Sequence, residues 1–227
     1  MAKQKKNSNY VTEKTTAAKA EKEAQKIKEK KQKNIKIIAI ASISFVSALA
    51  IILGILFACG AFEYSPPVTS HVNIELQDYG TLHVELYGKD APDTVQHFKE
   101  LAGNKYFNGL TLHTLSNGLL YGGSKSATNI EEGINGEFTA NGFNNKVKME
   151  KGVIVMARGE LNNSGYGQFF IVTEEEAEEL QGNYAAFGRI TNLDVLDSIL
   201  EKIGSVDGEI NPTTAPKIVS ISDHDHD

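Results

Sequence analysis

Three short apolar runs decide the fold: GVIVMAR at residues 152–158, GQFFIV at 167–172 and YAAFGRI at 184–190. Each is rich in β-branched or aromatic side chains, and glycine begins or interrupts all three. Apolar runs of this length are typical of buried strands and are too short for ordinary helices. These runs therefore predict the central strands of a mainly β domain.

Five further runs predict strands on either side of these three, at 71–77, 81–87, 110–115, 118–121 and 217–221. The first two alternate between apolar and polar side chains, which indicates strands with one buried face. Residues 78–80, between them, read DYG. This predicts a three-residue hairpin turn with Gly80 in the left-handed conformation. Eight strands are predicted in all.

Two substantial helices are predicted among these strands. The first has Asp90 as its cap, Pro92 in its first turn and Gly103 at its end. The second covers 193–203, where apolar residues recur at helical spacing. A capping-box pattern that starts at Thr173 predicts a short acidic helix as well. Because strands and helices do not alternate as βαβ units, we expect a closed eight-stranded antiparallel barrel capped by two helices.

Charge is divided unevenly along the chain of 227 residues. Residues 1–36 hold 12 of the 23 Lys and Arg and 4 of the 29 Asp and Glu, so this segment carries +8 and the remainder −14. We interpret 1–34 as a basic cytoplasmic tail that supplies no core. No aromatic or arginine pattern accompanies its lysines, so we expect no nucleic-acid partner.

The next segment, 35–59, predicts a single transmembrane helix. No charged side chain lies between Lys36 and Glu63, and about twenty apolar residues cross a bilayer core of about 30 Å. The lysines that precede it predict a cytoplasmic N-terminus and an extracytoplasmic body. LFAC at 56–59 also resembles a lipobox, in which Cys59 would be lipidated and become the new N-terminus. An uncleaved anchor and a lipoprotein-like signal both tether the body to a membrane.

The remaining boundaries follow from composition. Residues 60–67 contain two consecutive prolines and form a linker, 68–223 form one domain with its own core, and 224–227 form an acidic, histidine-containing tail. The tail suits a solvated end better than a metal site. A lone cysteine, Cys59, excludes an internal disulfide and a cysteine-built zinc site. No cofactor or metal is expected.

The order of these motifs resembles the cyclophilin family of peptidyl-prolyl cis-trans isomerases. The three opening runs carry the resemblance, and YFNGLTLH at 106–113 and the pair Gly122 and Gly123 extend it. It covers about 72–221 and implies a helix-capped barrel that binds proline-containing polypeptides and needs no cofactor.

The resemblance also implies a peptide groove. Gln168 stands where the family positions substrate backbone, and Phe170 matches the floor of the proline pocket. Met156, Leu180 and Leu119 or Leu120 are the expected walls. Ala157 and Arg158 match the backbone-binding strand, and Tyr184 holds a position that is His or Tyr in the family.

The catalytic position departs from the family pattern. The family's His-Arg pair is His113 and Thr114 here, and Tyr121 falls where a glutamine usually supports the arginine. Twisting an X–Pro amide over its barrier of about 18–20 kcal/mol gives the prolyl nitrogen a lone pair that a positive donor stabilises. Loss of one such donor costs about 2.7–4 kcal/mol. Arg158 is one candidate for a partial substitute, and Arg189 is expected to be structural.

Three functions remain open from the sequence. The first is a weak prolyl isomerase that assists the folding of exported or surface proteins, where X–Pro isomerisation is slow. The second is a catalytically inactive, cyclophilin-like module that binds proline peptides as a chaperone at the cell surface. The third is an adhesion or envelope-structural domain that uses the barrel exterior and has no affinity for proline peptides.

Overall fold

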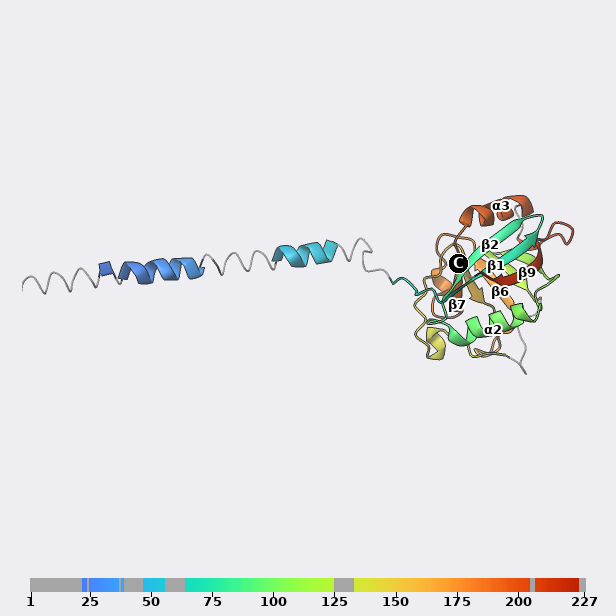
Figure 1. Ribbon diagram of the computed structural model, residues 1–227, viewed down its shortest axis with the longest axis horizontal. Helices are drawn as coiled ribbons and strands as arrows, with labels where there is room; N and C mark the ends of the chain where they lie inside the picture. Colours follow the sequence, from blue (N-terminus) through green and yellow to red (C-terminus); the bar gives the residue numbers. More distant parts are fainter. Residues whose placement is uncertain are drawn as a thin grey trace, which may run out of the picture. The chain divides into compact units, whose positions relative to one another are not determined.

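The computed structural model describes residues 22–23, 25–36, 38, 47–55, 64–124, 133–204 and 207–224. The chain divides into two units, Met1–Glu63 and Tyr64–Asp227, of which the second is the folded body (Figure 1). Within the first unit, residues 25–36 and 47–55 are helical. Much of the predicted anchor 35–59, including Cys59, lies outside the described residues, as do 60–63 of the linker and 225–227 of the tail.

Among the residues that the structure describes, no helix is both long enough and apolar enough to cross a membrane.

The body is an antiparallel barrel. Its strands are β1 Ser70–Gln77, β2 Gly80–Leu86, β3 Thr111–Ser116, β4 Leu119–Gly123, β5 Val153–Met156, β6 Gln168–Val172, β7 Ala185–Ile190, β8 Gly208–Glu209 and β9 Lys217–Asp223. The order β4-β6-β5-β7-β2-β1-β9-β3 closes on itself through the β3–β4 pairing. All eight predicted strands are present in this ring. The two-residue β8 was not predicted, and it pairs with β3 outside the ring.

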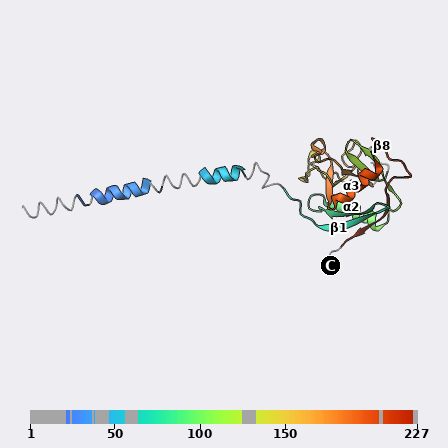
Figure 2. The same ribbon diagram turned by 90° about the horizontal axis from the view of Figure 1, so that it is seen from above.

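Two helices cover the barrel from opposite sides. Helix α2, Pro92–Gly103, and helix α3, Leu193–Ile203, lie at opposite sides of the strands in Figure 1, and α3 overlies α2 when the body is seen from above (Figure 2). Phe98 of α2 and Leu196 of α3 both belong to the main apolar cluster inside the barrel. The prediction of a mainly β barrel capped by two helices is therefore confirmed, and the predicted bounds of α3 match the structure.

The first hairpin has the predicted turn. Residue Gly80 has a φ of +94°, and Asp78 is also left-handed at +66°. Strands β1 and β2 then pair in register from Leu76 opposite Gly80 to Ser70 opposite Leu86. This register turns Val72, Ile74 and Leu76 inward, as their alternation predicted.

A distant carboxylate caps helix α2, which corrects the prediction for Asp90. The Asp90 side chain makes no capping bond, and its Oδ1 instead accepts a hydrogen bond of 2.7 Å from the Tyr64 hydroxyl. The fully buried Glu137 accepts bonds from the backbone N–H groups of Asp93, at 3.0 Å, and of Thr94, at 2.8 Å. A carboxylate in this place satisfies free amides and meets the positive end of the helix dipole.

The acidic helix predicted from Thr173 is absent from the described residues, which contain only the three-residue 3-10 turn Glu178–Leu180 nearby. The Thr173 hydroxyl does not cap a helix, because it donates to the carbonyl of Gly118 at 2.8 Å, as the Thr173 amide also does at 2.9 Å. These bonds tie the end of β6 to the turn between β3 and β4.

Candidate functional site

The strand order brings the strands that carry most candidate residues side by side in the barrel wall. Strand β4 lies between β3 and β6, so that Tyr121 is opposite both Thr114 and Phe170, and Gly123 is opposite Gln168. Strand β5 follows β6 on the other side. Residues that are far apart in sequence therefore meet along four neighbouring strands.

His113 and Gln168 form a polar group around one carbonyl oxygen. The Gln168 Nε2 donates to the backbone oxygen of Ser124 at 2.9 Å, and the His113 Nε2 lies 3.3 Å from the same oxygen. The Nδ1 of the same ring lies 2.8 Å from the Thr114 hydroxyl oxygen, within hydrogen-bond distance. The Thr114 hydroxyl is therefore hydrogen-bonded to a neighbouring side chain.

A bulge accounts for the position of His113. The β3–β4 register shifts between Leu112 and Thr114, which leaves His113 as the extra residue. Bulges of this kind re-aim a side chain next to a functional site. The short β8 adds Glu209 directly opposite Thr114. Sequence reasoning missed both Glu209 and the Ser124 carbonyl, since a two-residue strand and a backbone acceptor leave no side-chain pattern.

Phe170 lies at the centre of a second apolar cluster, separate from the barrel interior. Leu119 and Ala157 are buried with it, and Tyr121, Leu180 and Tyr184 pack at the edge of the cluster. The Phe170 ring centroid is 5.4 Å from that of Tyr121 and 5.5 Å from that of Tyr184. Only 1% of the Phe170 surface is exposed, so its own neighbours cover the predicted pocket floor in this structure.

Two of the predicted wall residues belong to the barrel interior, which corrects their assignment. Leu120 and Met156 are members of the interior cluster, on the opposite face of β4 and β5 from Leu119 and Val155. Successive residues of a strand point to opposite faces, so the neighbours of inward residues face outward. Leu119, not Leu120, is therefore the leucine beside Phe170.

Arg158 is held in place by aromatic rings and backbone. Its guanidinium carbon lies 5.1 Å from the ring centroid of Phe138 and 4.9 Å from that of Tyr184. Its Nε donates to the Asn183 carbonyl at 3.0 Å and its Nη1 to the Gly159 carbonyl at 2.9 Å. The other arginine, Arg189, pairs with Glu150 at 2.7 Å on β7. Both arginines are thus engaged by groups of the barrel itself, as expected of residues that stabilise the fold.

Burial raises the pKa of the Tyr121 hydroxyl, and the nearby Tyr184 hydroxyl adds a smaller increase. Tyr121 is therefore neutral, and a hydrogen-bond donor, at physiological pH.

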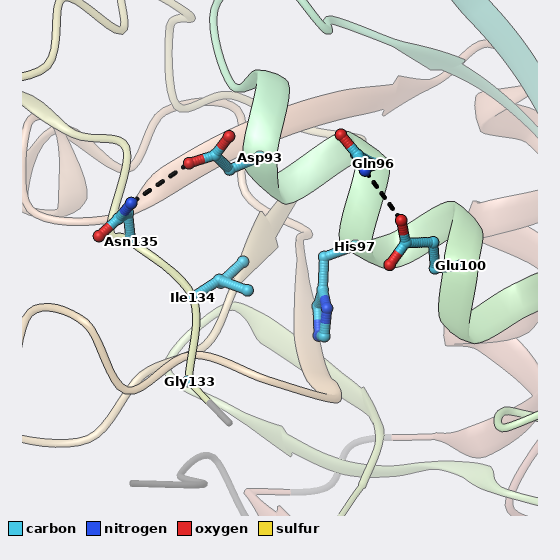
Figure 3. Close-up of a pocket in the computed structure, with 7 residues that line it drawn as sticks. All are labelled: Asp93, Gln96, His97, Glu100, Gly133, Ile134 and Asn135. Carbon is cyan, nitrogen blue, oxygen red and sulfur yellow. Dashed lines mark hydrogen bonds between the residues drawn. The ribbon is translucent and has the colours of Figure 1, made fainter. Parts of the chain in front are cut away.

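A separate open cavity of about 320 Å³ lies beside α2 (Figure 3). Asp93, Gln96, His97 and Glu100 extend toward it from the helix, and residues 133–135 form its other side. Asn135 donates to Asp93 and Gln96 to Glu100, so these polar groups satisfy each other. None of the predicted site residues lines this cavity. Among the described residues, no cluster of three or more His, Cys, Asp or Glu is arranged to hold a metal ion.

Comparison with known proteins decides the family. The family model of the cyclophilin type peptidyl-prolyl cis-trans isomerase/CLD matches residues 71–223. The chain belongs to this family. Its family membership identifies it as an isomerase of X–Pro peptide bonds.

Individual relatives agree with the family match. The chain is 27% identical over 180 residues to a peptidyl-prolyl cis-trans isomerase of Acinetobacter baylyi, which covers 76% of this chain and 93% of that protein. It is 29% identical over 140 residues to peptidyl-prolyl cis-trans isomerase B of Escherichia coli, which covers 58% of this chain and 82% of that protein.

Solved structures share the fold. A cyclophilin type isomerase of Cryptosporidium parvum superposes with a TM-score of 0.59 at 24% identity, over 70% of this chain and 99% of that chain. The same protein was also solved in the presence of the dipeptide Ala-Pro. Residues 64–227 form a compact unit that contains the apolar core, so we expect them to fold by themselves.

The contacts of Arg158 predict a structural role. Arg158→Ala removes two hydrogen bonds to backbone and two cation–π contacts, so the free energy of unfolding is expected to fall by about 1–3 kcal/mol. Arg158→Lys keeps the charge but loses the planar guanidinium group, so its free energy of unfolding should decrease by less than that of Arg158→Ala. Urea unfolding of residues 64–227 measures both. If neither variant changed stability, Arg158 would be free to act on a substrate in place of the missing arginine.

Proposed function

We propose that the barrel is a slow prolyl isomerase that acts on exported or surface polypeptides outside the membrane. The observation that carries the proposal is the set of side chains on its outer face, where the Phe170 cluster lies beside Gln168 and His113 and Thr114 occupies the catalytic position. The family supplies the reaction, and the side chain at 114 sets its rate.

Isomerisation requires two contributions from the site, which are binding of the proline peptide and stabilisation of the twisted amide. Phe170, Leu119 and Leu180 offer an apolar surface for a prolyl ring, and Gln168 offers an amide for the flanking backbone. Catalysis requires that the twisted amide be bound better than either planar form. A cation that donates to the prolyl nitrogen would provide this preference. Thr114 has no charge, and its hydroxyl is hydrogen-bonded to His113, so the twisted state of the amide gains little stabilisation from this side chain.

An arginine at position 114 should therefore raise the rate. We expect Thr114→Arg to increase kcat/KM for a peptide with one Ala-Pro bond by about a hundredfold to a thousandfold, because it restores one preorganised donor. NMR exchange spectroscopy of the peptide with residues 64–227 measures the cis–trans rate.

Ser116→Arg is the matched control, since it places the same charge on β3 two residues away and should leave the rate unchanged. If the natural chain does not accelerate exchange but its resonances shift when the peptide is added, the isomerase proposal fails. The domain would then be a module that binds proline peptides without catalysis. If no resonance shifts, neither function holds.

We further propose that residues 35–59 anchor the chain in a membrane, with the N-terminus in the cytoplasm and the body outside. The support is the charge-free apolar stretch and the lysines that precede it. This placement would bring the isomerase close to polypeptides that are folding as they are exported, where X–Pro isomerisation takes about 10–100 s without a catalyst.

The anchor can be tested in cells that express the full chain. The protein should sediment with membranes and resist alkaline extraction, and protease added outside spheroplasts should remove the body. Deletion of 35–59 should abolish sedimentation, whereas Cys59→Ala should not if the segment is an uncleaved helix. Incorporation of labelled fatty acid that is lost in Cys59→Ala would favour lipidation, and a body protected from external protease would contradict the proposed orientation.

A further inference from the structure

We propose that Tyr121 is a cover over the proline pocket, which a peptide must displace before its prolyl ring reaches Phe170. The inference rests on the proposed function, because it assigns control of access to the same site. It adds that Tyr121, more than any wall residue, sets the affinity of the barrel for proline peptides.

The position of Tyr121 in the sheet makes it a cover. It lies on β4 directly opposite Phe170 on β6 and directly opposite Thr114 on β3. The two ring planes make an angle of 50°, with the centroids 5.4 Å apart. Phe170 is 99% buried among Tyr121 and the other members of the outer cluster, while Tyr121 itself remains partly exposed.

Tyr184, on the other side of Phe170, is held more firmly than Tyr121. The Arg158 guanidinium lies 4.9 Å from the Tyr184 ring centroid, and Arg158 is itself fixed to the Asn183 carbonyl. The Tyr121 hydroxyl, in contrast, has no hydrogen bond within the part of the chain that the structure describes. Rotation of Tyr121 out of the cluster therefore breaks only apolar contacts.

Such a cover lowers affinity without touching the bound peptide. If the open form has a population of about 1–10%, the apparent Kd is about ten to a hundred times the intrinsic value. Removal of the ring makes the open form permanent and abolishes this penalty. The cover and the missing arginine are independent, since the first acts on binding and the second on the rate of the bound peptide.

The test compares Tyr121→Ala with the natural chain as residues 64–227. NMR titration with a tetrapeptide that has one central Ala-Pro bond gives Kd, and the same spectra show whether each variant is folded. We expect Tyr121→Ala to lower Kd about tenfold or more. Tyr121→Gln, which also lacks the ring, provides a second measurement and should shift Kd in the same direction.

Tyr121→Phe is the matched control, since it keeps the ring and loses only the hydroxyl, and its Kd should stay within about twofold of the natural chain. If the natural chain binds and the two ringless variants bind no more tightly, the cover is refuted while the proposed function stands. If neither the natural chain nor any variant binds, both are refuted. A large change in Tyr121→Phe would also refute the cover, because it would assign the effect to the hydroxyl.

Discussion

Two consecutive phenylalanines on β6 face opposite sides of the barrel wall, and both the core and the site depend on this alternation. Phe169 points inward, where its ring meets those of Phe98 and Phe107 at centroid distances of 5.9 Å. Phe170 points outward into the second cluster. Because a strand has a period of two, fixing one ring in the core fixes the other on the outer face. The closed barrel therefore holds the site on a rigid element.

The same wall places a polar group of side chains beside the outer apolar cluster. His113, Gln168 and the Ser124 carbonyl are joined by hydrogen bonds beside the apolar cluster. Thr114 is hydrogen-bonded to His113, and a carboxylate residue, Glu209, lies opposite Thr114 on β8. Arg158 is positioned between Phe138 and Tyr184 and bonds to backbone. In the proposed function, this outer face binds the peptide, and the uncharged side chain at position 114 limits the rate of isomerisation.

The sequence predicts the strands well because their patterns are strong, and it fails where a partner is remote or very short. The cap of α2 could not be predicted, since Glu137 lies more than forty residues from Thr94 and only the closed fold brings them together. The two residues of β8 are too few to form a pattern. Thr173 matched a capping box, yet its hydroxyl bonds to the Gly118 carbonyl on a neighbouring turn.

The faces of the central strands were the hardest part of the site to predict. Runs such as VIVM and LL are apolar on both faces, so no alternation tells inward residues from outward ones. The resemblance placed Phe170 on the groove side, but Leu120 and Met156 were assigned to the wrong face for this reason. The cover formed by Tyr121 was also beyond the sequence, since it depends on cross-strand registers that only the structure gives.

The central claim is that proline rings bind on the outer face of β6, against Phe170. Intermolecular NOEs between an isotope-filtered proline peptide and residues 64–227 test it most directly. The account predicts NOEs from the prolyl ring protons to Phe170 and to its outer neighbours Leu119 and Leu180. NOEs confined to the α2 cavity around His97, or none to Phe170 in a peptide that binds, would contradict it.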